Sequence, residues 1–372
     1  MTMATALQRF GDRLLGRGSA AITVPVMDGA LKANRVLDAA ELVAELPGID
    51  DLASDGDTLY ASAGSVLYRI ENGAAVEAQR FDAEISAIAA RCGAAGSLVV
   101  VALGGRSVRV LQVDGARWPE IARLEQLAGQ PLVCVNALAF DGDDALVFSD
   151  GSQRHGPPDW CRDLMALGRS GRVGRWVFRD GGPAAELARG LQYAYGVLPA
   201  GNALRVSESW RHRVVGVGAD WVQGALPSEL PGYPSRMTPA VDGGFWLACF
   251  VCRTQLVEFV LREPEYRTRM MAEIDPRYWI APALSSGHSF LEPLQGAGVK
   301  QMGVLKPWAP PRSYGLVLRV GANGQVLGSL HSQVDGRHHG VTGLTEHVGR
   351  LYVTSKGSGR LLAVPVDVGA MK

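Results

Sequence analysis

The sequence predicts an all-β protein, a six-bladed β-propeller whose short helices are confined to the N-terminus and to insertions. A short strand of alternating apolar residues occurs six times after a Gly or Asp turn, and most copies precede a further strand. A repeat of roughly 40 residues with several short strands is typical of propeller blades, whose radial arrangement leaves few sheet edges exposed. The repeated strands are LYAS (59–62), LVVV (98–101), LVFS (146–149), LRVS (204–207), FWLA (245–248) and LYVT (351–354).

Length and composition agree with a single propeller domain over residues 1–372. Closed β-structures built from repeats exceed the usual domain size of about 100–200 residues, and no linker interrupts the chain. The 46 glycines and 7% aromatic residues are typical of a β protein that is dense in turns. Lys plus Arg and Asp plus Glu both number 37, so no basic surface for nucleic acid is expected. The predicted partner is a small molecule, neutral or singly charged.

The N-terminal residues 1–20 are predicted to form an amphipathic helix that packs on the propeller, because apolar residues recur there at helical spacing. A membrane-surface helix is the alternative, which the sparse positive charge of the polar face disfavours. Neither a signal peptide nor a run of ~20 apolar residues is seen, so we expect no membrane span and a cytoplasmic location. One of two segments, 22–27 or 37–46, is expected to complete the last blade, and the sequence leaves both open.

Two stretches interrupt the repeat. The first, residues 149–172, carries His155 and Trp160 and is expected to lie over one end of the disc. The second, residues 253–313, is placed between blades five and six and carries Trp279. A long irregular connection in a tight repeat is usually a binding loop, so we predict a lid over the central channel. A structural brace or an oligomer contact is the alternative role.

The five cysteines are odd in number and unevenly spaced. Cys249 and Cys252 form a CxxC pair, but they lie in a predicted strand, where positions i and i+3 face opposite sides and cannot easily share a metal ion. The seven histidines contain no HxH or HxxxH pair. Buried free thiols are therefore favoured over a zinc or redox site.

Several segments carry a family resemblance. They are NALAF (136–140), FSDGS (148–152), GLQYAYGV (190–197), VSESWRHRVV (206–215), LPGYP (230–234), GGFWLA (243–248), YGLVLR (314–319) and LYVTS (351–355). These segments resemble bacterial strictosidine-synthase-like proteins, which belong with the gluconolactonase, SMP-30 and paraoxonase propellers. The similarity covers about residues 45–365 and keeps the order of the blades. It implies a site at the mouth of the central channel, built from the starts of the innermost strands.

The resemblance also bears on cofactors. In the metal-dependent relatives a Glu, two Asn and an Asp hold a calcium ion, and the matching positions here are Asp50, Asn136, Tyr195 and Ser235. Calcium takes about 6–8 oxygen ligands and gains most affinity from carboxylates, so a weak or vestigial site at Asp50 and Asn136 is the most that is expected. No cofactor is assigned firmly. Plant relatives that condense an amine with an aldehyde use a glutamate where Thr342 stands here, so that reaction does not carry over.

Eight residues are candidates for the site. The predicted catalytic residues are Asp50, Tyr195, Ser235 and Arg236, and the predicted substrate-binding residues are Asn136, His155, His339 and Trp279. Because Ser235 replaces an Asp, Arg236 is expected to be free for a substrate carboxylate or oxyanion and to take over the role of the cation with Tyr195. Simpler roles stay open: Asp50 and Asn136 as caps of backbone amides, Tyr195 as a channel plug, and the histidines as exposed loop residues.

The favoured function is that of a small-molecule hydrolase of the lactonase or esterase type. Two alternatives stay open: a metal-independent enzyme of C–N bond-forming or isomerase type, and a propeller that binds a ligand without catalysis. Asn136 together with an acid at position 50 favours an enzyme, whereas Tyr195 and Ser235 favour a binding protein. The sequence does not identify the substrate or the oligomeric state.

Overall fold

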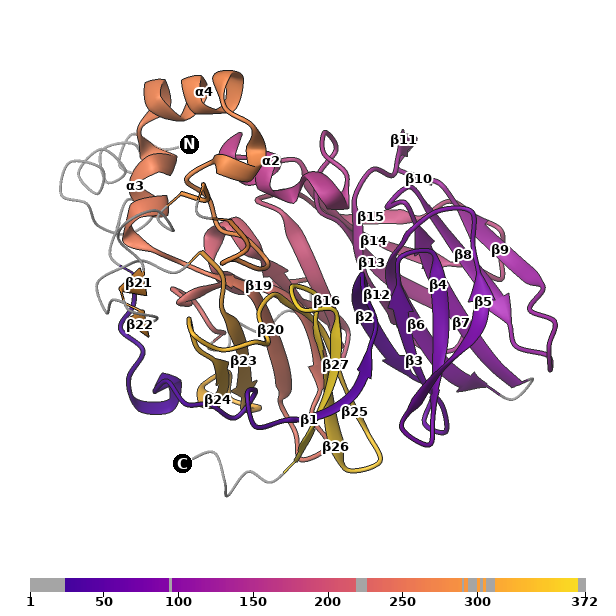
Figure 1. The fold of residues 1–372 in the computed structure, drawn as a ribbon. Helices are drawn as coiled ribbons and strands as arrows, with labels where there is room; N and C mark the ends of the chain where they lie inside the picture. The colour runs from indigo at the N-terminus through magenta and orange to yellow at the C-terminus, as the bar shows by residue number, and fades with distance from the viewer. Residues whose placement is uncertain are drawn as a thin grey trace.

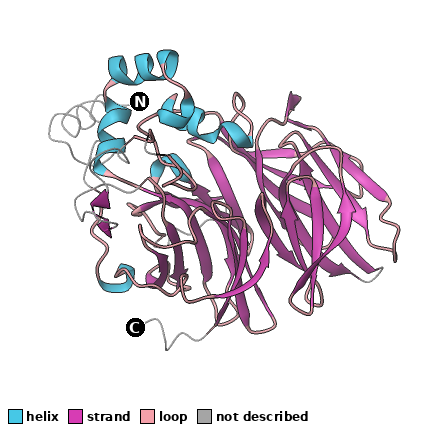
Figure 2. Ribbon diagram, viewed as in Figure 1, coloured by secondary structure: helices cyan, strands magenta, loops and turns pink. Residues whose placement is uncertain are grey.

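The computed structural model describes residues 24–93, 96–218, 226–289, 291–293, 300–301, 304–305 and 312–366. Within these residues, the chain forms six antiparallel sheets of three or four strands, and strands make up most of the ribbon (Figures 1 and 2). The first strand of each sheet contacts the first strands of both neighbouring sheets, which closes the ring. The predicted six-bladed propeller is therefore confirmed. No helix in the described part of the chain is long and apolar enough to span a membrane.

The blades follow one another along the chain, and in each the innermost strand comes first. Blade one contains β2 (Ile49–Ser54), β3 (Leu59–Ala63), β4 (Val66–Glu71) and β5 (Ala74–Arg80); blade two contains β6 (Ile85–Gly93), β7 (Gly96–Leu103), β8 (Ser107–Gln112) and β9 (Glu120–Leu124). Blade three contains β12 (Val135–Phe140), β13 (Ala145–Asp150), β14 (Gly171–Val177) and β15 (Ala185–Leu191); blade four contains β16 (Ala194–Ala200), β17 (Ala203–Glu208) and β18 (Arg213–Val217). Blade five contains β19 (Gly232–Pro239), β20 (Phe245–Cys252), β23 (Gly315–Val320) and β24 (Val326–Ser332). Two short hairpins lie outside the blades: β10 (Gln126–Leu127) with β11 (Gln130–Pro131), and β21 (Lys300–Gln301) with β22 (Val304–Leu305).

The ring is closed by an N-terminal strand. Blade six contains β25 (Val341–His347), β26 (Arg350–Ser355) and β27 (Arg360–Pro365), and its outermost strand is β1 (Glu41–Glu45). β1 pairs antiparallel with β27. Of the two candidate segments, 37–46 therefore completes the last blade, whereas residues 24–27 form no strand. The predicted helix over residues 1–20 lies outside the described residues.

Both insertions connect the second strand of a blade to its third. Residues 151–170 join β13 to β14, and residues 253–314 join β20 to β23. The prediction that residues 253–313 lie between blades five and six is therefore wrong. YGLVLR (314–319) belongs to blade five, where Phe245 of β20 lies opposite Val320 of β23. Antiparallel pairing does not require a short connection, so a long insertion leaves the register of the sheet intact.

This topology places both insertions at the same end of the channel. Each innermost strand starts at one end, the second strand returns to it, and the connection to the third strand therefore lies there too. Figures 1 and 2 show the helices of the insertions gathered at this end. We call residues 151–170 and 253–289 the cap. Its helices are η3 (Pro157–Asp159), α2 (Trp160–Met165), α3 (Gln255–Arg262), α4 (Pro264–Glu273) and η5 (Pro276–Tyr278).

The cap has a hydrophobic core of its own. The Thr254 side chain accepts a hydrogen bond from the Val257 N–H and so caps α3, and Pro264 ends that helix and starts α4 because it has no N–H to donate. Val257 and Val260 of α3 then pack with Trp279 and with aromatic residues of blades four and five. Since Trp279 is fully buried, the cap is packed onto the blades rather than suspended over them.

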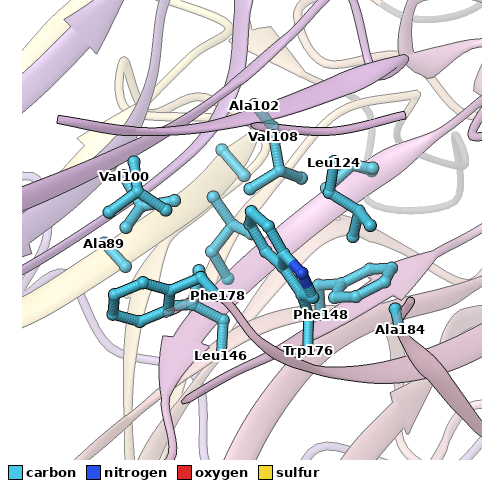
Figure 3. Close-up of a cluster of buried hydrophobic side chains, with 14 of the residues drawn as sticks. Ala89, Val100, Ala102, Val108, Leu124, Leu146, Phe148, Trp176, Phe178 and Ala184 are labelled. Atoms are coloured by element: carbon cyan, nitrogen blue, oxygen red, sulfur yellow. The ribbon is translucent and has the colours of Figure 1, made fainter. Parts of the chain in front are cut away.

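The main cores lie between adjacent blades. Between blades two and three, alternate residues of facing strands interdigitate around Phe148 and Trp176 (Figure 3). Gly174 makes room for this packing, because a Cβ atom there would lie 2.4 Å from the Phe148 ring. Fully burying a side chain of this size contributes about 1.5–3 kcal/mol, so these inter-blade contacts provide much of the stability that fixes the site.

Candidate functional site

Each innermost strand has an irregularity near its start. A β-bulge leaves a residue outside the hydrogen-bond ladder, so its main-chain groups are available for other partners. Because the six bulges lie at one level of the channel, main-chain oxygens converge there. The register shifts fall between Ile49 and Asp51, Ile85 and Ala87, Val135 and Ala137, Ala194 and Val197, Pro234 and Met237, and Val341 and Leu344.

Hydroxyl groups of the second strands tie these bulges together. Ser207 of β17 accepts a hydrogen bond from Gly196 N (2.7 Å) in its own blade and donates one to Ser235 O (2.7 Å) in the next blade. The hydroxyl thus couples blades four and five at the level of the bulges. The same position of the repeated strand holds Ser62, Ser149 and Thr354, whose hydroxyls also bond main-chain groups of the innermost strands.

The side chain of Arg236 lies at the centre of this level. The bulge in β19 turns it into the channel, where it is only 5% exposed. Its guanidinium group donates to four main-chain oxygens, and it lies close to two carboxylates. The oxygens are Asn136 O at 2.8 Å, Asp50 O at 3.0 Å, Thr342 O at 3.1 Å, Ser86 O at 2.5 Å, Asp50 Oδ1 at 3.5 Å and Asp51 Oδ2 at 3.1 Å.

Blade four completes the surroundings of Arg236 with an aromatic ring. The Cζ atom of Arg236 lies 5.3 Å from the centroid of the Tyr195 ring, a cation–π arrangement. The expectation that Arg236 is free for a substrate is therefore wrong, because carbonyls and carboxylates of this chain already surround its donors. The joint role expected of Arg236 and Tyr195 toward a substrate stays a prediction.

The two neighbouring acids have different environments. Burial opposes ionisation of Asp50, but the charges of Lys356, whose Nζ lies 3.2 Å from Asp50 Oδ1, and of Arg236 lower its pKa overall. Burial raises the pKa of Asp51 to about 6, although Arg236 and the N–H groups of Ile88 and Leu52 favour its charged form. Both side chains are therefore carboxylates at neutral pH.

A pocket lies between this polar level and the cap. Its polar floor includes Asp50 and Lys356, and its walls are largely aromatic. The space left for the centres of water-sized molecules is about 20 Å³, which is room for about one water molecule. The lining residues are Asp50, Ser86, Asn136, Thr342 and Lys356 of the floor, Trp160, Tyr193, Tyr195 and Phe250 of the walls, and Pro157 and Leu284 of the cap.

The aromatic walls hold one another in place. The Phe250 ring centroid lies 5.1 Å from that of Trp160 in an edge-to-face arrangement and 5.4 Å from that of Tyr195. Tyr193 stacks on Trp210, with ring centroids 4.3 Å apart. Such pairs add about 0.5–1.5 kcal/mol each beyond burial. Tyr195 and Phe250 belong to blades four and five, whereas the Trp160 ring belongs to the cap and packs against Phe250 in the closed pocket.

Of the eight predicted site residues, only Asp50, Asn136 and Tyr195 line the pocket. Asn136 is fixed by a hydrogen bond from its Nδ2 to Ala194 O (3.1 Å). Ser235 is fully buried, and its hydroxyl donates to Val341 O (3.2 Å), so it braces blades five and six and has no base beside it. Arg236 lies below the floor.

The three residues predicted to bind substrate from the insertions and loops do not reach the pocket. Trp279 is buried in the cap, where its Nε1 donates to Ile274 O (2.9 Å). His339 is held between Ser313 Oγ (2.8 Å) and Gln333 O (2.7 Å). His155 is partly exposed in the insertion of blade three and is not among the lining residues. Sequence position does not reveal which way a loop side chain turns.

Sequence reasoning missed Asp51, Ser86, Lys356 and Phe250. The alternation rule assigns Asp51 to the face opposite Asp50, and the bulge removes that distinction. Lys356 directly follows the repeated strand LYVTS. This position places it at the end of the channel where the innermost strands begin, and it could have identified Lys356 as a site residue. Nothing in the local sequence distinguishes Phe250 from a core residue.

Acids at the ends of the second strands in other blades have structural roles in this fold. Asp150 pairs with Arg172, and Glu208 pairs with Arg213, each linking the second strand of a blade to its third. Glu346 lies at the other end of blade six, where it accepts hydrogen bonds from Val241 N and Trp246 Nε1.

A calcium ion does not fit the floor of the pocket. The positively charged guanidinium of Arg236 already occupies the space among the oxygens of Asp50, Asp51 and the innermost strands. Two of the four positions that hold the ion in the metal-dependent relatives are Tyr195 and Ser235, and the Ser235 hydroxyl points to blade six. In the described residues, no group of three His, Cys, Asp or Glu side chains could hold a metal ion, and the cysteines described there are all free thiols.

Comparison with known proteins identifies the fold. Neither a scan against models of protein families nor a search of curated proteins finds a match to this chain. A gluconolactonase from Xanthomonas campestris is 16% identical, with a TM-score of 0.54 over 92% of this chain and 95% of its own. A luciferin-regenerating enzyme is 13% identical, with a TM-score of 0.52 over 89% of this chain and 94% of its own. Regucalcin from Agrobacterium tumefaciens, a calcium-binding protein, is 12% identical, with a TM-score of 0.51 over 89% of this chain and 93% of its own. The chain therefore has the six-bladed propeller fold of the gluconolactonase and regucalcin structures.

Proposed function

We propose that this protein is a metal-independent hydrolase that opens small lactones or esters in the pocket above Asp50, with the cap acting as its lid. The observation that carries the proposal is the meeting of a carboxylate, an ammonium group and an amide, from Asp50, Lys356 and Asn136, on the floor of an aromatic pocket. A gluconolactonase is among the solved structures with this fold, which favours the same reaction class.

In this proposal Asp50 is the general base. Its carboxylate takes a proton from a water molecule in the pocket as the water oxygen bonds to the substrate carbonyl carbon. The ammonium group of Lys356 turns to the oxyanion that forms, and its departure from Asp50 raises the basicity of that carboxylate. The intermediate collapses with cleavage of the C–O bond of the ring or ester. Asp50 returns the proton to the departing alkoxide oxygen, so the products are a carboxylic acid and an alcohol.

Substrate entry requires the cap to move, because the closed pocket has room for about one water molecule. Pro157, Trp160 and Leu284 are the cap residues that line the pocket, and they come from two different insertions. Lids of this kind exclude water from a site once the substrate is bound. The same enclosure favours a second candidate function, binding of a small ligand without turnover.

The test is hydrolysis of a panel of aliphatic lactones and aryl esters by the wild-type protein in the presence of EDTA. Asp50→Asn should lower kcat/KM by roughly 10²–10⁴-fold, because it removes the base. Lys356→Met should lower kcat more than it raises KM. Asp57→Asn is the control, since Asp57 is an exposed acid of the same blade, and its activity should equal that of the wild type. Saturable binding of a lactone without hydrolysis would support the binding function instead.

The pH profile provides an independent check on the base. Because the pKa of Asp50 is lowered from its ordinary value of 3.8, its carboxylate persists as the pH falls to that value. The acid limb of kcat/KM should therefore lie below pH 3.8, provided that the protein is still folded. An acid limb near pH 6.5 would instead indicate a histidine base and would contradict this role of Asp50.

A further inference from the structure

All six blades meet at the guanidinium group of Arg236. Blade five supplies the side chain itself, and blade four supplies the Tyr195 ring that faces it. The remaining four blades supply the oxygens around it: Asp50 and Asp51 of blade one, Ser86 of blade two, Asn136 of blade three and Thr342 of blade six. Among the described residues, no other side chain contacts every other blade.

We propose that Arg236 is an internal cation that holds the propeller together at its axis and occupies an oxygen cage that would otherwise bind a divalent metal ion. The cage has six oxygens, two of them from carboxylates. Calcium takes about 6–8 oxygen ligands and prefers carboxylates and main-chain carbonyls, so the donor set suits it once the guanidinium is removed. This inference concerns stability and cation binding, and it does not depend on the proposed hydrolysis.

The geometry explains why an arginine serves here. Burying a charge is costly unless it is paired and hydrogen-bonded, and here both conditions are met by groups of the chain itself. The planar guanidinium directs its N–H groups outward in several directions, so one side chain reaches oxygens of four blades. A lysine ammonium is a single point of charge and cannot reach the oxygens of all four blades at once.

A cation attached to the chain cannot dissociate. The midpoint of thermal unfolding of the wild-type protein should therefore be the same in EDTA and in millimolar calcium chloride.

Tight association of the blades at this level also requires Gly196 and Gly343. A Cβ atom on Gly196 would lie 2.4 Å from Ser235 O, and one on Gly343 would lie 3.0 Å from Asp50 O.

The test compares Arg236→Met with Arg172→Met by thermal unfolding. Arg172 is a matched buried arginine, but it contacts one carboxylate, that of Asp150, and only two carbonyls, those of Leu127 and Pro131. Both variants should unfold roughly 4–6 °C below the wild type in EDTA, because each leaves a buried carboxylate unpaired. Millimolar calcium should restore most of the loss in Arg236→Met and none in Arg172→Met.

Three outcomes would overturn the proposal. The first is an Arg236→Met variant as stable as the wild type in EDTA. The second is a loss of stability that neither calcium nor methylguanidinium, a soluble mimic of the missing group, reverses. If Arg236→Met does not fold alone, refolding in calcium or methylguanidinium replaces the first comparison, and failure in both counts against the proposal. The third is an Arg236→Lys variant that equals the wild type in stability, since the proposal requires several directed donors as well as a charge.

Discussion

The two ends of the central channel are built from the same six strands but differ in chemistry. At the cap end, the strands begin with bulges, the lining is polar and aromatic, and the pocket has room for about one water molecule. At the opposite end the same strands continue as regular ladders. The cavity there is about 360 Å³ and is lined largely by small or apolar residues such as Ala53, Ala89 and Ala139.

The difference shows where a propeller can build a site. A regular ladder uses its main-chain groups within the sheet, whereas a bulge frees them to face the channel. The cap end therefore acquires converging carbonyls, which allow a buried cation such as Arg236 to be satisfied. The charged side chains that line the wider cavity at the opposite end are already paired: Asp51 with Arg236, and Arg91 with Asp143.

The largest expected effect tests the close approach of the bulges. Gly196→Ala should lower the free energy of unfolding by about 2–4 kcal/mol, because its Cβ would lie 2.4 Å from Ser235 O and 2.9 Å from Arg236 Cα. Denaturant titration measures this change. Gly182→Ala is the control, since no atom lies within 4 Å of the Cβ position there, and it should change stability by less than about 0.5 kcal/mol. Equal effects of the two substitutions would contradict the tight packing inferred at the cap end.

A second prediction concerns the attachment of the cap. Glu258 of α3 lies 2.9 Å from Arg253 Nε and 3.3 Å from His212 Nε2. Burial opposes its ionisation, but hydrogen bonds and charge from His212 and Arg253 lower its pKa from 4.5 to about 2. Since the folded-state pKa is the lower one, the stabilisation is present above pH 4.5 and is lost as the pH falls toward 2.

Glu258→Gln should therefore remove part of the acid sensitivity of the protein. Between pH 4.5 and 2, the free energy of unfolding of the wild type should fall by on the order of 2–3 kcal/mol more than that of the variant. Thermal unfolding at several pH values measures this difference. Glu265→Gln, at an exposed position of α4, is the matched control and should follow the wild-type profile. A Glu258→Gln profile that overlays the wild type would show that this ion cluster does not secure the cap.

The smallest effect compares one substitution at both ends of the channel. Thr342 donates a hydrogen bond to Asp50 O (2.6 Å) at the cap end, whereas Thr238 lines the opposite cavity. Thr342→Val should lower the free energy of unfolding by about 1–2 kcal/mol, because it leaves a buried carbonyl with one hydrogen-bond partner fewer. It should also lower any hydrolytic activity. Thr238→Val should change stability by less than about 0.5 kcal/mol and leave activity unchanged. A Thr238→Val variant as impaired as Thr342→Val would remove the distinction between the two ends.

The candidate site was predictable in part. Asp50, Asn136 and Tyr195 line the pocket together, as expected from the family resemblance, which placed all three at the starts of innermost strands. His339 and Trp279 were expected there on residue type alone, and both are held elsewhere by local contacts. The direction of a side chain in a long connection depends on packing against distant residues, which no local pattern encodes.

The sequence by itself determined the number and order of the blades, because alternation at period two and turn residues are local signals that recur with each repeat. Only the tertiary structure decided that residues 253–313 interrupt blade five and that Arg236 faces the axis. Alternation predicts that neighbours such as Asp50 and Asp51 face opposite sides, yet both contact Arg236. The physical reason is the bulge at the start of each innermost strand, which forms because the main-chain and hydroxyl partners that stabilise it come from the adjacent blade.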